Sequence, residues 1–178
     1  MRDRLLKGTG ILQAMITMDV MALATISLAA WAGSHRVEGE LDSNARHVAW
    51  GLGTALLNLV ARCIAIFYML ASGRAVKDLV AECGLDPAFV VRSKKIKRGV
   101  ETMATLALVP LMVAAIGGGK VHVGGDLGPH SAWAWAAVAM AFLCLVLDVR
   151  AGIRNLRLLR EVDDLVRALP EPGEKGSS

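Results

Sequence analysis

Four long apolar segments constrain the fold of this chain more than any other feature of its sequence. They cover residues 9–32, 48–72, 100–118 and 131–149. A hydrocarbon core of about 30 Å is crossed by about 20 helical residues, so each segment is long enough to span a bilayer. With 54% apolar residues and a mean hydropathy of +0.49, the chain is more hydrophobic than an ordinary soluble domain. The sequence therefore predicts an all-α polytopic membrane protein with four transmembrane helices.

The second half of the sequence repeats the first. His47-Val-Ala-Trp50 opens the second segment, and His130-Ser-Ala-Trp133 opens the fourth, 83 residues later. Arg74-x-Val76-x-Asp78-Leu79-Val80 returns 86 residues later as Arg160-x-Val162-x-Asp164-Leu165-Val166. We therefore expect two parallel-repeat helical hairpins related by a pseudo-two-fold axis along the membrane normal. The first hairpin would cover residues 1–86 and the second 87–170, together forming one membrane domain, with a disordered tail at 171–178.

Positive charge and tryptophan predict the orientation of this domain. Sixteen of the 20 Lys and Arg residues precede the first segment, separate the second from the third, or follow the fourth. Because basic residues are retained on the cytoplasmic side, both termini should be cytoplasmic, in a bacterial inner membrane. The tryptophans at 31, 50, 133 and 135 all fall at the opposite boundary, where indole rings prefer to lie.

The same anchoring explains the net charge of +4 without a nucleic-acid partner. One basic cluster, just before the third segment, is also suited to binding anionic lipid headgroups. It consists of Arg92, Lys94, Lys95, Lys97 and Arg98.

The second and fourth helices are predicted to extend into the cytoplasm as amphipathic arms. Their apolar stripes consist of Val76, Leu79 and Val80 in one arm and Val162, Leu165 and Val166 in the other. Apolar stripes in the cytoplasm must be shielded from water by other apolar surfaces. They could pack on each other and on a helix beginning near Pro87, or they could bind another membrane subunit or a second copy of the chain.

Two charged residues are predicted to meet inside the bilayer. Asp19 lies 12 residues before Trp31 and Arg62 lies 12 residues after Trp50, so at 1.5 Å per residue both are about 18 Å below the outer boundary. An unpaired charge there costs at least about 2.5 kcal/mol, so an ion pair is expected.

Asn58, one turn from Arg62, could complete this network. The pair would serve either as a polar step in an ion path or as a lock between helices. The repeat favours the lock, because it places the apolar Leu145 of the second hairpin at the depth of Arg62.

Histidines and acidic residues gather at the predicted outer surface. Imidazole and carboxylate groups are suitable ligands for a divalent metal, and the candidates are His35, Glu40, His47, His122, Asp126 and His130. Because His47 and His130 are equivalent in the repeat, they could instead be the two axial ligands of a haem b. The alternative is that each histidine caps its helix or lies at the headgroup level, with no cofactor bound.

Enzymatic function is not favoured, because the sequence has no phosphate-binding glycine loop, nucleophile elbow or Cys-x-x-Cys motif. The leading expectation is a non-enzymatic integral subunit that oligomerises or docks on a larger membrane complex. One alternative is a small-ion channel or transporter that uses Asp19 and Arg62. The other is a metal- or haem-binding electron-transfer subunit that uses His47 and His130.

Overall fold

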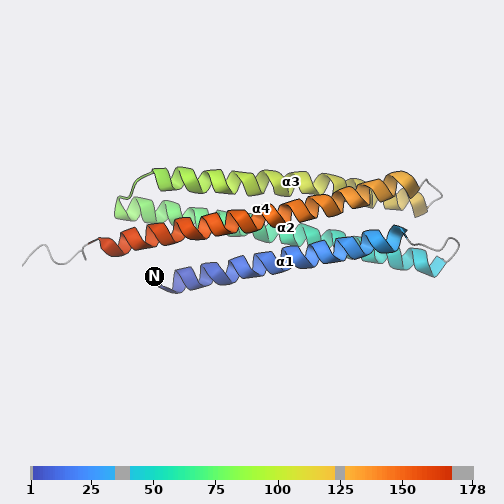
Figure 1. The fold of residues 1–178 in the computed structure, drawn as a ribbon, viewed down its shortest axis with the longest axis horizontal. Helices are drawn as coiled ribbons and strands as arrows, with labels where there is room; N and C mark the ends of the chain where they lie inside the picture. The colour runs from blue at the N-terminus through green and yellow to red at the C-terminus, as the bar shows by residue number, and fades with distance from the viewer. Residues whose placement is uncertain (1, 35–40, 123–126, 170–178) are drawn as a thin grey trace, which may run out of the picture.

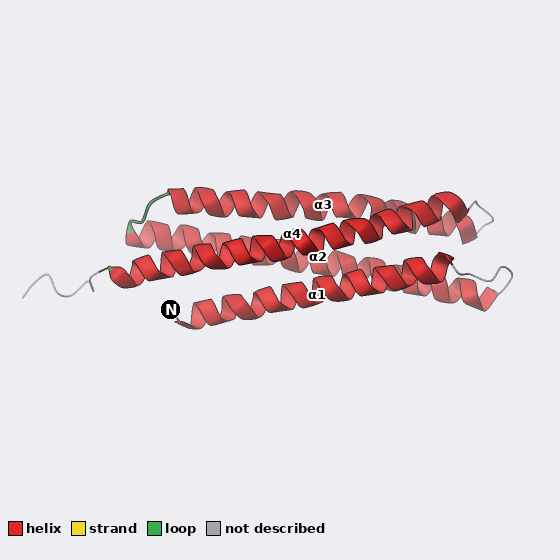
Figure 2. Ribbon diagram, viewed as in Figure 1, coloured by secondary structure: helices red, strands yellow, loops and turns green. Residues whose placement is uncertain are grey.

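A computed structural model shows an all-helical chain (Figures 1 and 2). It describes the backbone of residues 2–34, 41–122 and 127–169, and the side chains of residues 9–33, 46–118 and 128–169. The helices are α1 (Arg2–Ser34), α2 (Leu41–Cys83), α3 (Ala88–His122) and α4 (Leu127–Ala168). Each of them is long and apolar enough to cross a membrane. The prediction of an all-α membrane chain with four spans is thus confirmed at this level.

The four helices form an elongated bundle in which neighbours in sequence run in opposite directions (Figure 1). Each of α1 and α3 packs against both α2 and α4, and α2 also touches α4 across the bundle. Within the described residues, the backbones of α1 and α3 do not come into contact with each other. The first residues of α1 and the last residues of α4 therefore lie at one end, which we call the terminal end (Figure 1). The opposite end, with the four tryptophans, is the tryptophan end.

The surface of the bundle is unusually apolar. Large hydrophobic side chains that would be buried in a soluble protein are exposed along all four helices, among them Leu28, Leu52, Phe67, Met112 and Phe142. Exposed apolar surface on this scale requires an apolar solvent or a partner. Lipid supplies this cover in a membrane, and helices are suited to it because their backbone polar groups bond internally.

Two helices are longer than the hydropathy pattern predicts. The second was expected to begin at His47, but α2 begins at Leu41, so His47 lies in its second turn and does not cap it. The third apolar segment ends at residue 118, within the run of glycines 117–119, but α3 continues through them to His122. Both differences have one reason. A helix satisfies its own backbone hydrogen bonds, so it can continue beyond the apolar segment and through glycines.

A tight turn joins α2 to α3 at the terminal end. Gly84 has a φ of 64°, the left-handed conformation that favours glycine after the last helical residue. The Leu85 amide donates to the Val80 carbonyl at 3.1 Å, which satisfies one free carbonyl of α2. Asp86 then accepts a hydrogen bond from the Ala88 amide at 2.8 Å and caps α3. These are the stop and start signals that the sequence contains here.

The predicted arms cover each other at this terminal end. Val76 and Val162 are fully buried, and they share a cluster with Val80, Leu158 and Phe89, the last from α3. Leu79 and Val166 pack on the same cluster, and Leu165 is 41% exposed. Of the two arrangements considered for the arms, the structure has the internal one. Most of the surface that a docking partner would need is therefore used by the chain itself.

Candidate functional site

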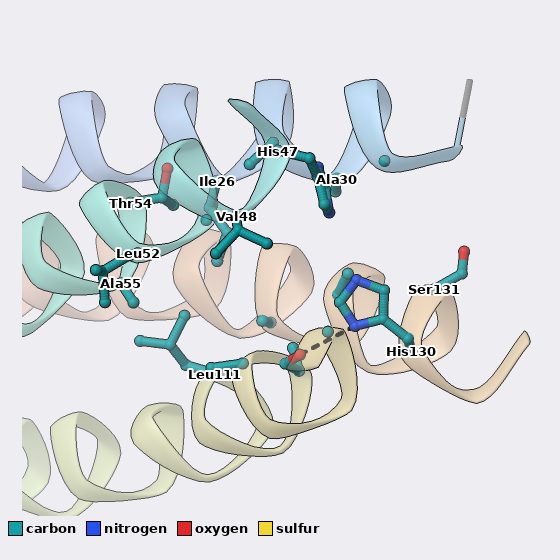
Figure 3. Close-up of a pocket in the computed structure, with 18 of the residues that line it drawn as sticks. Ile26, Ala30, His47, Val48, Leu52, Thr54, Ala55, Leu111, His130 and Ser131 are labelled. Atoms are coloured by element: carbon teal, nitrogen blue, oxygen red, sulfur yellow. Dashed lines mark hydrogen bonds between the residues drawn. The ribbon is translucent and has the colours of Figure 1, made fainter. Parts of the chain in front are cut away.

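A cavity of about 450 Å³ lies between the four helices near the tryptophan end (Figure 3). Its walls are mostly small or aliphatic, as Ala30, Leu111 and Ala137 illustrate, and its few polar side chains include His47 and His130. The exposed side chains of Val48 and Leu52 belong to its rim, so the cavity reaches the surface beside α2. It could hold more than ten waters at about 30 Å³ each, but the walls offer few partners for them. A largely apolar ligand suits such a space better than water does.

The imidazoles of His47 and His130 approach each other in this cavity (Figure 3). Their ring centroids are 6.0 Å apart and their planes are nearly perpendicular, at 89°. His47 comes from α2 and His130 from α4, the two helices that touch across the bundle. The structure therefore brings together the histidines of the two His-x-Ala-Trp motifs.

The hydrogen bond of His130 defines its tautomer. Its Nδ1 atom lies 3.0 Å from the carbonyl oxygen of Ala114. Because a carbonyl only accepts, Nδ1 must carry the proton and donate it. The neutral ring then has its free lone pair on Nε2, where a metal could bind. A ligand histidine is commonly oriented by such a hydrogen bond from its other nitrogen.

Glycines at the ends of the preceding helices make room for both rings. A Cβ at Gly33 of α1 would lie 2.7 Å from Cε1 of His47. A Cβ at Gly118 of α3 would lie 3.1 Å from Cε1 of His130, and Gly117 is also next to this ring. Each histidine thus packs against a glycine backbone, and a side chain at Gly33 could not be accommodated without moving the imidazole.

The other predicted ligands cannot be placed. His35, Glu40 and Asp126 lie outside the described residues, and the side chain of His122 is likewise not described. Among the described side chains, no group of three or more His, Cys, Asp or Glu residues could hold a metal ion together. The described part of the site therefore offers two protein ligands to a metal, from His47 and His130.

A second buried polar group lies nearer the terminal end. Arg62 of α2 forms ion pairs with Asp19 of α1 and with Asp148 of α4. The three residues are 5%, 2% and 1% exposed, respectively. We call them the charge triad. The triad connects three helices, and the pairing of Asp19 with Arg62 that their depths suggested is present in the structure.

Asp148 was missed in the sequence, and the reason can be identified. The offset of 83 residues between the two histidines places Leu145 opposite Arg62. The offset of 86 residues in the arms places Asp148 there instead, and this is the residue that Arg62 contacts. The expectation of an apolar second hairpin at this depth was therefore wrong, because Asp148 of α4 lies beside Arg62.

Asn58 lies one turn from the triad but bonds elsewhere. Its side-chain amide donates to the carbonyl oxygens of Ala22 at 3.3 Å and Thr54 at 3.0 Å. It therefore links α2 to α1 rather than extending the ion pairs. A void of about 10 Å³ borders both Asn58 and Arg62, and it shares Ile26, Leu111 and Ala137 with the large cavity.

The fold and these two sites define a four-helix multi-pass membrane protein with a histidine-lined cavity above a buried charge triad. No family model, curated protein or solved structure matches the chain. Its function must therefore be inferred from its own residues.

Proposed function

We propose that the protein binds one haem b between His47 and His130 and transfers single electrons within a membrane. The observation that carries this proposal is the separation of 6.0 Å between the two imidazole centroids inside an apolar cavity. With metal–nitrogen bonds of about 2.0–2.1 Å, two imidazoles on opposite sides of one metal have centroids about 6 Å apart. The separation of the two rings therefore matches the spacing that axial ligation of one haem iron by two histidines would need.

The size and lining of the cavity favour haem over a bare metal ion. A bare ion between two histidines needs further ligands, and the described side chains supply none. Haem iron brings four ring nitrogens with it, so two axial histidines complete its coordination. The macrocycle is flat, apolar and bulky, which suits a cavity of about 450 Å³ walled by Ala, Gly, Ile and Leu side chains. Cofactor sites in helix bundles are commonly built in this way, from facing helices.

In this function, the protein would orient the two histidine ligands and provide an apolar environment around the haem. The Ala114 carbonyl holds the His130 ring through Nδ1, and Gly33 holds the position of His47. The apolar walls limit access of water to the metal, which is one of the factors that set the potential of a haem.

Titration of the purified protein with haem b, followed by visible absorption, tests the proposal. We expect one haem per chain with the low-spin spectrum of six-coordinate iron. His47→Ala and His130→Ala should each weaken binding at least tenfold and remove the six-coordinate spectrum. Ser131→Ala is the matched control, because Ser131 lines the same cavity without a ligand nitrogen. Equal binding by all four proteins would reject the assignment.

The repeat, orientation and location of the protein remain part of this proposal. Two observations support a pseudo-two-fold arrangement. His47 contacts His130. Arg62 pairs with Asp148, which lies 86 residues later in the sequence, and this is the same offset that relates the two arms. The excess of Lys and Arg at the terminal end supports cytoplasmic termini in a bacterial inner membrane. The haem would then lie near the outer face.

The proposals for lipid and protein partners are based on the residues that are exposed on the surface of the bundle. Arg92, Lys94, Lys95 and Arg98 are exposed, as headgroup binding requires, and Lys97 is half-buried. A docking or homo-oligomeric role would use the apolar surface within the bilayer rather than the arms, whose stripes are largely buried. An electron-transfer subunit needs a donor and an acceptor, so this role is compatible with a larger membrane complex.

A further inference from the structure

The charge triad carries an imbalance that its surroundings do not correct. Asp19 and Asp148 are two carboxylates, and Arg62 is one guanidinium. All three are at most 5% exposed. With every group ionised, the triad would have a net charge of −1 in the hydrocarbon region. An uncompensated charge in such surroundings is costly, and a buried titratable group commonly neutralises instead.

The geometry of the two carboxyl groups indicates how the charge is balanced. Asp19 and Asp148 lie beside the same guanidinium, where Asp19 pairs with Nη2 of Arg62 and Asp148 pairs with Nη1. Two buried carboxylates held by one guanidinium repel each other unless one of them carries a proton. The Oδ2 atom of Asp19 is also buried, and no described residue donates a hydrogen bond to it. Paired carboxyl groups elsewhere share one proton for the same reason.

We propose that the charge triad is a proton-binding site that holds one exchangeable proton between Asp19 and Asp148. Binding converts one carboxylate to a carboxylic acid, with no other reactant, and makes the triad neutral. The site does not depend on the haem, because it is built from other residues and can be measured in the haem-free protein.

Neighbouring ionisable groups do not supply the missing positive charge. On α4, the Cys144 thiol lies near the triad and carries no positive charge; it donates a hydrogen bond to the Met103 carbonyl at 3.7 Å. On α3, Lys97 and Glu101 pair with each other at 3.4 Å on a half-exposed surface, and Arg98 is exposed. Among the described side chains, α1 has no ionisable group besides Asp19, and the arginines of α2 nearest in sequence to Arg62 are Arg74 and Arg46, at least three helical turns away.

The proton can reach the triad from the tryptophan end. The void of about 10 Å³ beside Asn58 and Arg62 has room for roughly one water, and its lining overlaps that of the large cavity. On the other side of the triad, a cluster including Leu12, Met15 and Met69 closes the bundle. This asymmetry predicts exchange through Asn58 and not from the terminal end.

Infrared spectroscopy of the haem-free protein at neutral pH tests the site. The wild type should show the C=O band of one protonated carboxyl group. Asp19→Asn and Asp148→Asn should each abolish this band, because one carboxylate then balances one guanidinium. Arg62→Gln should increase it, because both carboxyl groups then need a proton. Helicity by circular dichroism checks that each variant is folded.

The outcomes separate the proposal from a simple ion-pair lock. A wild-type spectrum without the band would overturn it, and so would a band that persists in both Asn variants. The route is tested by the rate at which the band shifts after transfer to D₂O. Asn58→Leu should slow this shift at least tenfold, whereas Tyr68→Phe, on the terminal side of the triad, should not. Equal slowing by both variants would contradict the proposed route.

Discussion

The two ends of the bundle are built differently, although short sequence motifs of α2 recur in α4 at both ends. At the terminal end, Val76, Leu158 and Val162 pack in a buried hydrophobic core. At the tryptophan end, the corresponding space between the helices is a cavity of about 450 Å³ lined by glycine, alanine and two histidines. Close packing holds the first half together, so the looser second half is free to accommodate a ligand. The charge triad lies between the two.

The largest effect on stability is expected at the boundary between the halves. Arg62→Gln leaves two carboxyl groups buried without their cation, and loss of one partner from a buried ion pair costs about 3–5 kcal/mol. The folded variant would bind more protons than its unfolded chain, so its stability should fall as pH rises. Unfolding by denaturing detergent at pH 5 and pH 8 measures both effects. A loss below about 1 kcal/mol at pH 8 would show that the triad is not a structural link.

Matched leucine truncations compare the two halves directly. Leu158→Ala, in the packed core, should cost about 2–5 kcal/mol. Leu111→Ala borders the cavity, where one side of the residue already lacks neighbours, so it should cost less than about 1.5 kcal/mol in the haem-free protein. The free energy of unfolding of each variant gives the comparison. Equal losses would mean that the tryptophan end is packed as tightly as the terminal end.

A glycine substitution should affect the ligand site with little effect on the fold. In Gly33→Ala, the new Cβ would meet the His47 ring at 2.7 Å and displace it. We expect haem affinity to fall about tenfold, or about 1.4 kcal/mol, as measured by titration. Gly10→Ala, on the same helix with nothing within 4 Å of the new Cβ, is the control. If both variants bind haem like the wild type, the position of His47 does not determine binding.

The smallest effect is expected at the surface of the terminal end. Arg92 and Glu161 form an ion pair at 2.9 Å, but both side chains are about half exposed. Glu161→Gln should change the free energy of unfolding by about 0–1 kcal/mol, as exposed pairs usually do. Addition of salt to the wild type should give a change of similar size. A loss of stability comparable to that of Leu158→Ala would contradict this prediction, because the ion pair would then contribute as much as a core side chain.

The sequence alone predicted the four helices and the equal depth of Asp19 and Arg62. Hydropathy and length predict four spans, and counting from Trp31 and Trp50 brings Asp19 level with Arg62. The start of α2 was misplaced because Leu41 to Arg46 are not part of an apolar segment, and hydropathy does not detect a helix that continues into water. The same limit applies to α3, which continues beyond the third apolar segment to His122.

The partners of the sites were harder to predict than the helices. Asp148 could have been found by applying the arm offset to Arg62, but the two offsets differ by three residues, and only packing shows where one replaces the other. The hydrogen bond from His130 to Ala114 depends on a side-chain rotamer and on the backbone of a neighbouring helix, which a repeat pattern does not encode. The contact between the two histidine rings is similarly a property of the assembled bundle.

The visible spectrum of the wild-type protein, expressed with ample haem and purified in mild detergent, tests the central claim most directly. Ligation by both His47 and His130 predicts a Soret band, one haem b per chain, and low-spin iron in both the oxidised and the reduced protein. Absence of the Soret band, or a five-coordinate high-spin haem, would contradict the proposal that these two imidazoles share one iron atom.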